Sequence, residues 1–142
     1  MAVSYYLDAS FLVALLTAES SSRRADQFVS SVTLPLLVSD FSAAEFSSAI
    51  ARTVRNHEAT VNEARMIFAA FDDWRGRRAR PIAIRPADIE LATAFMRGLD
   101  LPLKTPDAIH IAMTQRLGAS LVTLDRSMTA TARTLGVPVA DL

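Results

Sequence analysis

The sequence predicts an α/β fold of three layers, in which helices cover both faces of a mainly parallel central sheet of about five short strands. Short runs of β-branched and apolar residues alternate with longer stretches whose apolar residues recur at helical spacing. No two strand-like runs are joined by a two-residue hairpin turn. Strands separated by helices pair in parallel, so we expect a single domain over residues 1–142.

The first half of the chain is expected to hold two strands and four helices. Each strand run is short and apolar, and each helix shows apolar residues three and four positions apart. Polar residues that can cap a helix precede several of the helices. In order, the expected elements are a strand over Val3–Leu7, a helix through Phe11 and Leu16, a helix from Ser20 to Val32, a strand over Leu34–Ser39, a helix over Ala43–Ile50 and a helix over Thr60–Trp74.

The second half is expected to hold three strands and three helices. Proline opens two of these helices, where its missing N–H would be unbonded anyway, and glycine ends two of them. In order, the expected elements are a strand over Pro81–Ile84, a helix from Pro86 to Met96, a helix capped by Thr105 and ended by Gly118, a strand over Ala119–Leu124, a helix over Ser127–Leu135 and an edge strand over Val137–Val139.

The composition is that of an ordinary globular protein. With 51% hydrophobic and 21% charged residues, the chain does not belong to the disordered class. It contains no cysteine, which excludes disulfides and thiolate-bound metal ions. The N-terminus lacks the features of a secretory signal, and no stretch reaches the roughly 18 apolar residues of a membrane span. We therefore expect a soluble, cytoplasmic protein that does not contact a membrane.

Net charge gives no sign of a nucleic-acid partner. Fifteen basic residues balance fifteen acidic ones, so any polyanion must meet a local basic patch. The one such cluster comprises Arg75, Arg77, Arg78 and Arg80, and Lys104 is the only lysine. Clusters of this kind are usually solvated surface, and the alternative is contact with phosphates or with an acidic partner. The sequence leaves both interpretations open.

Acidic residues stand where elements begin or end at one predicted edge of the sheet. Asp8 and Asp125 directly follow strands, whereas Glu45 and Asp107 lie in the first or second turn of a helix. Each has an ordinary explanation as a cap, a dipole partner or a solvated side chain. In parallel sheets, however, the carboxyl ends of strands face the ligand crevice, and neighbouring strands are only about 4.8 Å apart. The four carboxylates can therefore converge.

Carboxylates that converge need a cation. Two of them about 5 Å apart repel by roughly 3 kcal/mol at an effective dielectric constant of 20, and several such pairs rival the stability of a small domain. A hard divalent ion removes the conflict, and oxygen ligands suit Mg²⁺ or Mn²⁺. Such an ion activates water and stabilises charge on a phosphate oxygen. The sequence therefore predicts a Mg²⁺ or Mn²⁺ site if the acids meet.

Four short motifs resemble the acidic motifs of the PIN-domain nucleases. They are Leu7-Asp8-Ala9-Ser10, Ala44-Glu45-Phe46, Thr105-Pro106-Asp107-Ala108-Ile109-His110 and Val122-Thr123-Leu124-Asp125-Arg126. The likeness covers essentially the whole chain, and it is specific because all four motifs occur in order at these intervals. Size and order resemble the VapC toxins of VapBC toxin–antitoxin pairs. The resemblance implies a PIN-like fold and a Mg²⁺- or Mn²⁺-dependent endoribonuclease that cleaves RNA phosphodiesters with a metal-activated water.

The resemblance also implies a role for individual residues. Asp8 and Asp107 would bind the metal directly, and Glu45 and Asp125 would act through water or a second metal. Together these four would form the catalytic acidic cluster. The supporting polar groups would be Ser10 and Thr123.

The partners implied by the resemblance are protein and RNA. VapC toxins are usually homodimers, held inactive by a VapB-like antitoxin whose C-terminal segment enters the active-site groove. On this interpretation the arginine cluster at residues 75–80 and Lys104 would contact the RNA substrate or the antitoxin.

Three other interpretations were weighed. A phosphoryl-transfer enzyme of the same sheet class needs Asp-x-Asp after its first strand, and Ser10 stands at the second position. A receiver domain needs a lysine after a late strand, whereas Lys104 precedes a helix. A non-catalytic partner-binding domain, with its carboxylates acting only as caps, stays open. Two further residues receive structural roles: His110 is expected on a helix surface, and Asp88 is expected to interact with a helix dipole.

Overall fold

A four-stranded parallel sheet forms the centre of the fold in the computed structural model, which describes residues 4–142. The strand order is β3-β2-β1-β4, and each neighbouring pair is parallel. The predicted α/β class with a parallel sheet is therefore confirmed. The strands are β1 (Tyr5–Leu7), β2 (Leu36–Ser39), β3 (Ala79–Ile82) and β4 (Ser120–Val122).

The sheet differs from the prediction at its edges. The expected strand over Val137–Val139 is reduced to an isolated bridge between Val139 and Leu121. Pro138 has no N–H to donate, so a regular ladder cannot continue through it. β3 begins at Ala79, two residues before the predicted start. Val3, which was expected in the first strand, lies outside the described residues.

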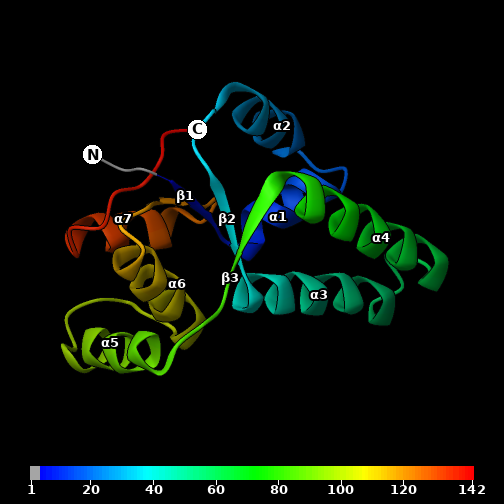
Figure 1. The fold of residues 1–142 in the computed structure, drawn as a ribbon. Helices are drawn as coiled ribbons and strands as arrows, with labels where there is room; N and C mark the ends of the chain where they lie inside the picture. Colours follow the sequence, from blue (N-terminus) through cyan, green and yellow to red (C-terminus); the bar gives the residue numbers. More distant parts are fainter. Residues whose placement is uncertain (1–3) are drawn as a thin grey trace.

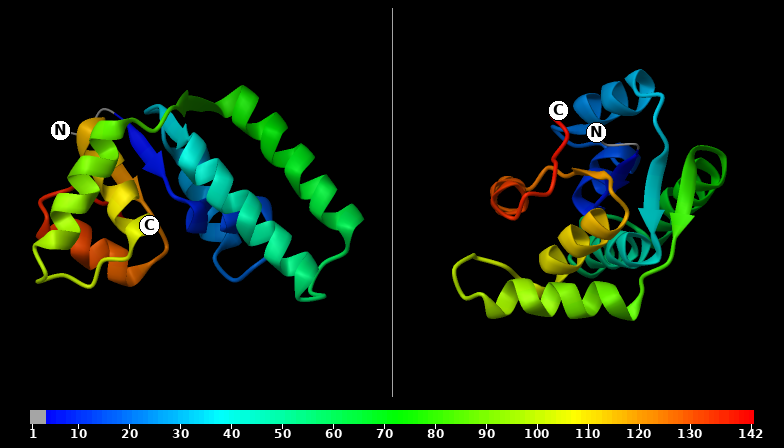
Figure 2. Two further views of the ribbon diagram at one scale, coloured as in Figure 1. Left: turned by 90° about the horizontal axis from the view of Figure 1, so that it is seen from below. Right: turned by 60° about the vertical axis from the view of Figure 1, so that its left-hand side comes forward.

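Seven helices connect and flank the strands within residues 4–142 (Figure 1). No helix in this part of the chain is both long and apolar enough to cross a membrane. α3 and α4 are longer than predicted and run side by side, extending beyond the sheet (Figure 2). The helices are α1 (Ala9–Leu16), α2 (Ser22–Ser31), α3 (Asp40–Arg55), α4 (Val61–Arg78), α5 (Pro86–Arg97), α6 (Thr105–Arg116) and α7 (Arg126–Thr134).

The helices cover the two faces of the sheet in two groups, which gives the three layers predicted. Side chains alternate along a strand, so Tyr6 of β1 packs on one face and Leu7 on the other. The Tyr6 face is covered by α5, α6 and α7, and the Leu7 face by α1 to α4. The core is therefore two apolar layers separated by the sheet.

The ends of α6 show which sequence signals were correct. Gly118 follows α6 with a φ of 60°, a conformation in which glycine has no steric penalty, as predicted. Thr105 is not the N-cap, because the N–H of Ala108 bonds to the carbonyl oxygen of Lys104 and so begins the helix one residue earlier. The side chain of Lys104 makes no capping hydrogen bond.

Asp88 has a larger role than the predicted interaction with a helix dipole. Its side chain is buried and accepts hydrogen bonds from Arg116 Nε at 2.6 Å and Nη2 at 3.0 Å. It also accepts from the N–H of Arg85 at 2.8 Å. This bidentate ion pair joins the start of α5 to the end of α6, and sequence spacing could not reveal it because the partners are 28 residues apart.

Candidate active site

Asp8 is the most buried of the four predicted acids, with 1% of its surface exposed. It follows β1 and caps α1, so its Oδ1 accepts from the N–H of Phe11 at 2.9 Å. Ser10 Oγ donates to the same oxygen at 2.7 Å, and Thr123 Oγ1 donates to Oδ2 at 2.5 Å. Every donor is neutral. The carboxylate is therefore fixed in orientation without a bonded positive charge.

Burial raises the pKa of Asp8 above its ordinary value. The hydrogen bond from Thr123 and the nearby His110 oppose this shift. Within residues 4–142, no lysine or arginine forms an ion pair with Asp8. Aspartate is almost never fully buried without a compensating partner. Asp8 is thus a buried acid with no basic side chain bonded to it, and a nearby cation would favour its ionised form.

The hydroxyls of Ser10 and Thr123 connect the turns that follow β1 and β4 by hydrogen bonds. Ser10 Oγ accepts from the N–H of Leu124 at 3.1 Å and lies 3.4 Å from Thr123 Oγ1. Thr123 Oγ1 also accepts from the N–H of Asp125 at 3.0 Å. Because β1 pairs directly with β4, the turns that follow them lie side by side. The structure therefore places both predicted supporting residues against Asp8.

Asp125 occupies the start of α7, at the same edge of the sheet. Its Oδ1 accepts from the N–H of Met128 at 3.0 Å, so the residue is the N-cap of this helix. The predicted role of Asp125 as a helix cap is therefore correct. Its half-buried position beside Thr123 also leaves it close to the other acids.

Asp107 is influenced by the charges of the other three predicted acids. It lies half-buried in the first turn of α6, and within residues 4–142 its side chain accepts no hydrogen bond. Burial raises the pKa of Asp107, and the negative charge of Asp125 raises it further, while His110 opposes the shift. The charges of Glu45 and Asp8 act in the same direction as that of Asp125. All four predicted acids therefore share one region of the molecule.

Glu45 is held by a residue that sequence reasoning placed wrongly. Its Oε1 is hydrogen-bonded to Nε2 of His110, which is 1% exposed rather than on a helix surface. The reason is that α6 is buried all round from Ala108 to Thr114. His110 Nδ1 in turn bonds to the hydroxyl of Tyr6 at 2.8 Å. The available signal was His110 itself, one turn beyond Asp107 and the one polar residue within the run from Ala108 to Met113.

Tyr6 connects this pair to the start of α3. Its hydroxyl lies 2.8 Å from Ser39 Oγ, and Ser39 caps α3 by accepting from the N–H of Ser42 at 2.8 Å. Burial raises the pKa of Tyr6, so the phenol stays neutral. An ionised Glu45 can only accept, so the proton of a neutral His110 is on Nε2 and its Nδ1 accepts from Tyr6. The chain of contacts thus fixes the orientation of the imidazole.

The carboxyl oxygens of the four acids suit a hard divalent ion, but these oxygens do not surround a single point. Within the described part of the chain, no three acidic or histidine side chains are arranged to hold a metal ion. Asp8 faces its hydroxyl donors, and Glu45 faces His110. The acids nevertheless offer only oxygen donors, and Asp8 is buried with no bonded basic side chain within residues 4–142. The chemistry of the site therefore fits Mg²⁺ or Mn²⁺.

The predicted arginine cluster is divided among separate structural roles. Arg75 lies 3.3 Å from Asp72 and its guanidinium is 5.0 Å from the centre of the Phe71 ring. Arg77 pairs with Asp73 at 2.8 Å. These are exposed pairs within one turn of α4, of the kind that stabilise a helix slightly.

Arg77, Arg78 and Arg80 line one shallow hollow of about 260 Å³ beside the start of β2, and Arg75 does not line it. Arg78 donates to the carbonyl oxygens of Val29 and Val32 at 2.9 and 3.2 Å, and so satisfies the end of α2. Arg80 is exposed on the edge strand β3. Lys104 is exposed just before α6, three residues from Asp107. Of the predicted contact residues, Lys104 is therefore the one placed nearest in sequence to an acid of the site.

The family model for the PIN domain matches residues 5–134, which is most of the chain. This chain belongs to the PIN-domain family. The resemblance seen in its four acidic motifs is thereby confirmed. No curated protein sequence matches this PIN domain.

Solved structures of similar fold include several toxin–antitoxin proteins. Mycobacterium tuberculosis VapC20, described as a toxin that cleaves the sarcin-ricin loop, matches with a TM-score of 0.71 and 18% identity over 89% of this chain and 93% of that one. VapBC2 from Rickettsia felis, solved with a promoter DNA fragment, matches with a TM-score of 0.71 and 12% identity over 98% of both chains. VapBC-1 from nontypeable Haemophilus influenzae matches with a TM-score of 0.71 and 14% identity over 97% of both chains. At these identities the likeness establishes a shared fold.

Proposed function

We propose that this PIN domain is the toxin of a type II toxin–antitoxin system and acts as a Mg²⁺- or Mn²⁺-dependent endoribonuclease. The observation that carries the proposal is Asp8, a buried carboxyl without an ion-pair partner, near an Asp107 whose pKa is raised by the charges of the other three acids. Membership of the PIN-domain family supports a nuclease, and the structural neighbours named as VapC or VapBC proteins support a toxin.

The four acids would divide the work of holding the ion. Asp8 and Asp107 are proposed as direct ligands, because one is buried without a positive partner and the other accepts no hydrogen bond within residues 4–142. Glu45 bonds to His110 and Asp125 accepts from the N–H of Met128, and we assign both indirect roles through water or a second ion, as the resemblance to PIN-domain nucleases implies. Catalysis is attributed to the four together.

The surrounding residues would keep these acids in place. Ser10 and Thr123 orient both oxygens of Asp8, which removes the need to order that side chain when a cation binds. A bound divalent ion supplies the activation of water and the charge stabilisation that phosphodiester hydrolysis requires. His110, held by Tyr6, keeps Glu45 directed at the same edge of the sheet.

The proposed partners follow from the proposed function. RNA is the proposed substrate, and a VapB-like antitoxin and a second copy of the chain are the proposed protein partners. Two of the similar structures are VapBC complexes by name, and another is described as a toxin–antitoxin complex from Klebsiella pneumoniae. The charge of the acid cluster would attract a basic side chain from an antitoxin, which would compete with the metal ion.

The direct test is cleavage of a mixed RNA pool by the purified chain with Mg²⁺ and with EDTA. We expect cleavage only with the metal ion, and none by the Asp107→Asn variant. Asp26→Asn is the matched control, because Asp26 is an exposed aspartate on α2 without a contact to the acid cluster. Equal cleavage in EDTA, or full activity of Asp107→Asn, would contradict the proposal. A chain that cleaves nothing yet binds an acidic protein would favour the partner-binding alternative.

A further inference from the structure

A polar cavity of about 330 Å³ lies between α2, α7 and the β4–α7 turn. Its basic side chains are Arg24 from α2 and Arg126 and Arg133 from α7. None of these belongs to the cluster at residues 75–80 that the sequence singled out. Two helices far apart in the sequence therefore bring three guanidinium groups to one hollow.

The sequence of α7 explains how its two arginines flank this hollow. Arg126, Thr129, Ala130 and Arg133 are spaced at i, i+3, i+4 and i+7, so they share one face of the helix. The two arginines are about 10 Å apart along the helix axis. The threonine and alanine between them are short. A polar group can therefore enter between the two long side chains.

The guanidinium groups are largely free to bind a ligand. Within residues 4–142, neither Arg24 nor Arg126 makes an ion pair or a side-chain hydrogen bond. Arg133 bonds to Asp141 at 3.2 Å, and both side chains are exposed. Exposed pairs of this kind contribute little and exchange readily. The cavity thus holds two free cationic side chains, and a carboxylate already contacts the third.

The cavity adjoins the acid cluster through two residues. Thr123 lines the cavity and donates to Asp8, and Arg126 directly follows Asp125. The acid cluster repels a polyanion, and a net charge of zero provides no general attraction. An RNA strand that reaches the acids therefore needs cationic side chains immediately beside them.

We propose that this arginine cavity binds a phosphodiester group of single-stranded RNA, next to the bond that is cleaved at the acid cluster. The inference rests on the proposed endoribonuclease function. A guanidinium group matches the oxygens of a phosphate with two parallel hydrogen bonds. An acidic protein segment fits less well, because tight protein contacts use large apolar or aromatic anchors and the cavity has no aromatic lining residue.

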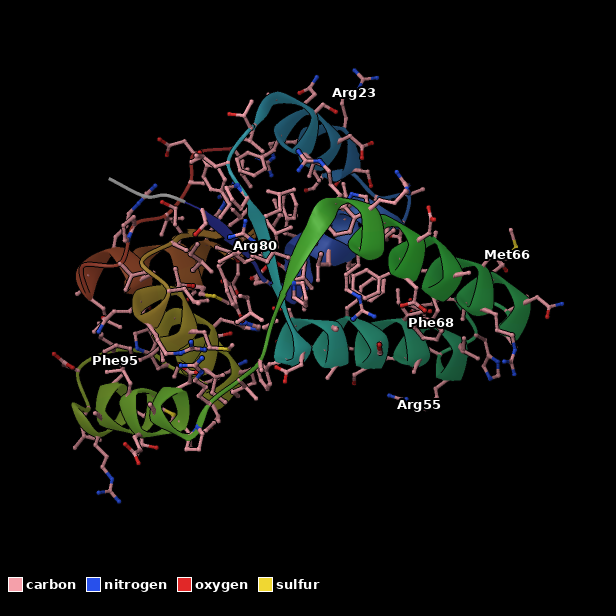
Figure 3. The ribbon with its side chains drawn as sticks, viewed as in Figure 1. Arg23, Arg55, Met66, Phe68, Arg80 and Phe95 are labelled. Carbon is pink, nitrogen blue, oxygen red and sulfur yellow. The ribbon has the colours of Figure 1, made fainter. Side chains whose placement is uncertain are left out.

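The test measures RNA binding rather than cleavage. The probe is a fluorescently labelled single-stranded RNA of mixed sequence, about 12 nucleotides long, titrated with the full chain in EDTA. The test variants are Arg24→Ala and the Arg24→Ala/Arg126→Ala double variant. Arg24 is the more telling position because it is on α2, away from the acids. The matched control is Arg23→Ala, whose side chain points outward from α2 (Figure 3) and does not line the cavity.

We expect the double variant to bind the RNA about tenfold more weakly, and Arg23→Ala to bind it as the unmodified chain does. The slope of log affinity against log salt should fall by about 0.7, the value for one phosphate on a single strand. In cleavage assays with Mg²⁺, Arg24→Ala should raise KM and leave kcat unchanged.

The outcomes separate this inference from the proposed function. Unchanged affinity and salt slope in the double variant would overturn the cavity proposal even if the unmodified chain cleaves RNA. Weakened binding in the variant, with no cleavage by the unmodified chain, would support the cavity and overturn the nuclease. An equal loss with Arg23→Ala, or no RNA binding at all, would overturn the cavity proposal. If the double variant loses affinity for a polyglutamate peptide but keeps its affinity for RNA, the cavity proposal is also overturned.

Discussion

The two sides of the acid cluster hold their carboxylates in different ways. On the β1–β4 side, Asp8 is buried and bonded only to neutral donors, among them Ser10 and Thr123. On the α3–α6 side, Glu45 is half-buried and bonded to the imidazole of His110, a group that can carry a positive charge. The first carboxyl has no basic side chain bonded to it, and the second is bonded to one. We therefore expect Asp8 to contribute more to metal binding than Glu45 does.

The largest expected effect separates these two sides directly. Asp8→Asn should reduce metal-dependent RNA cleavage by about a thousandfold, because a direct contact with the ion is worth several kcal/mol in the transition state. Glu45→Gln should reduce it by about 10- to 100-fold, as expected for a group that acts through an intermediary. Initial rates at saturating Mg²⁺ check both values. If the two variants lose the same amount of cleavage activity, Asp8 and Glu45 do not differ in their contribution to catalysis.

A substitution at His110 tests whether the α3–α6 side depends on its hydrogen bonds. His110→Leu should cost about 1–3 kcal/mol of unfolding free energy, because Tyr6 loses a buried partner. Cleavage should fall by about tenfold as Glu45 loses its contact.

The conservative variant His110→Gln distinguishes positioning from mere packing. Its amide can place an N–H near the position of Nε2, so it should recover part of the activity lost in His110→Leu. Urea unfolding and cleavage rates are measured on the same samples. If His110→Leu keeps full activity despite its lower stability, the imidazole does not position Glu45.

The smallest expected effect concerns charge repulsion at Asp107. Its raised pKa means that the folded chain binds the proton more tightly than the unfolded chain does, so stability is lost as pH rises from the ordinary aspartate range through the raised pKa. At neutral pH in EDTA, Asp107→Asn should therefore be more stable than the unmodified chain by about 0.5 kcal/mol, a small value because Asp107 is only half-buried.

This difference should disappear at a pH below the ordinary pKa of aspartate, where Asp107 is protonated in both states. Urea unfolding across the pH range measures it, and Asp26→Asn should show no such gain at neutral pH. A lower stability for Asp107→Asn at neutral pH in EDTA would mean that Asp107 is stabilised by its surroundings rather than repelled by them.

The same comparison shows how far the sequence could predict the site. The β1–β4 side was predictable because Asp8 and Asp125 follow strands, and the ends of parallel strands meet at one edge. Ser10 and Thr123 lie two residues from these acids, so their place follows from the same register.

The α3–α6 side was not predictable in this way. His110 and Glu45 are 65 residues apart, and their contact depends on how α6 packs over Tyr6 and Phe41. The spacing of apolar residues predicts which face of a helix is buried, but it does not predict how two helices are positioned relative to each other on a sheet. The arginine cavity between α2 and α7 escaped notice for the same reason, since its residues are dispersed along the chain.

The most direct test of the account is calorimetric titration of the unmodified chain, Asp8→Asn and Glu45→Gln with Mn²⁺. If the buried carboxyl of Asp8, which has no ion-pair partner, is the basis of a metal site, the unmodified chain binds Mn²⁺, Asp8→Asn does not, and Glu45→Gln binds with about 10- to 100-fold lower affinity. Circular dichroism of each sample verifies that it is folded. Equal Mn²⁺ affinity of the unmodified chain and a folded Asp8→Asn variant would contradict the account.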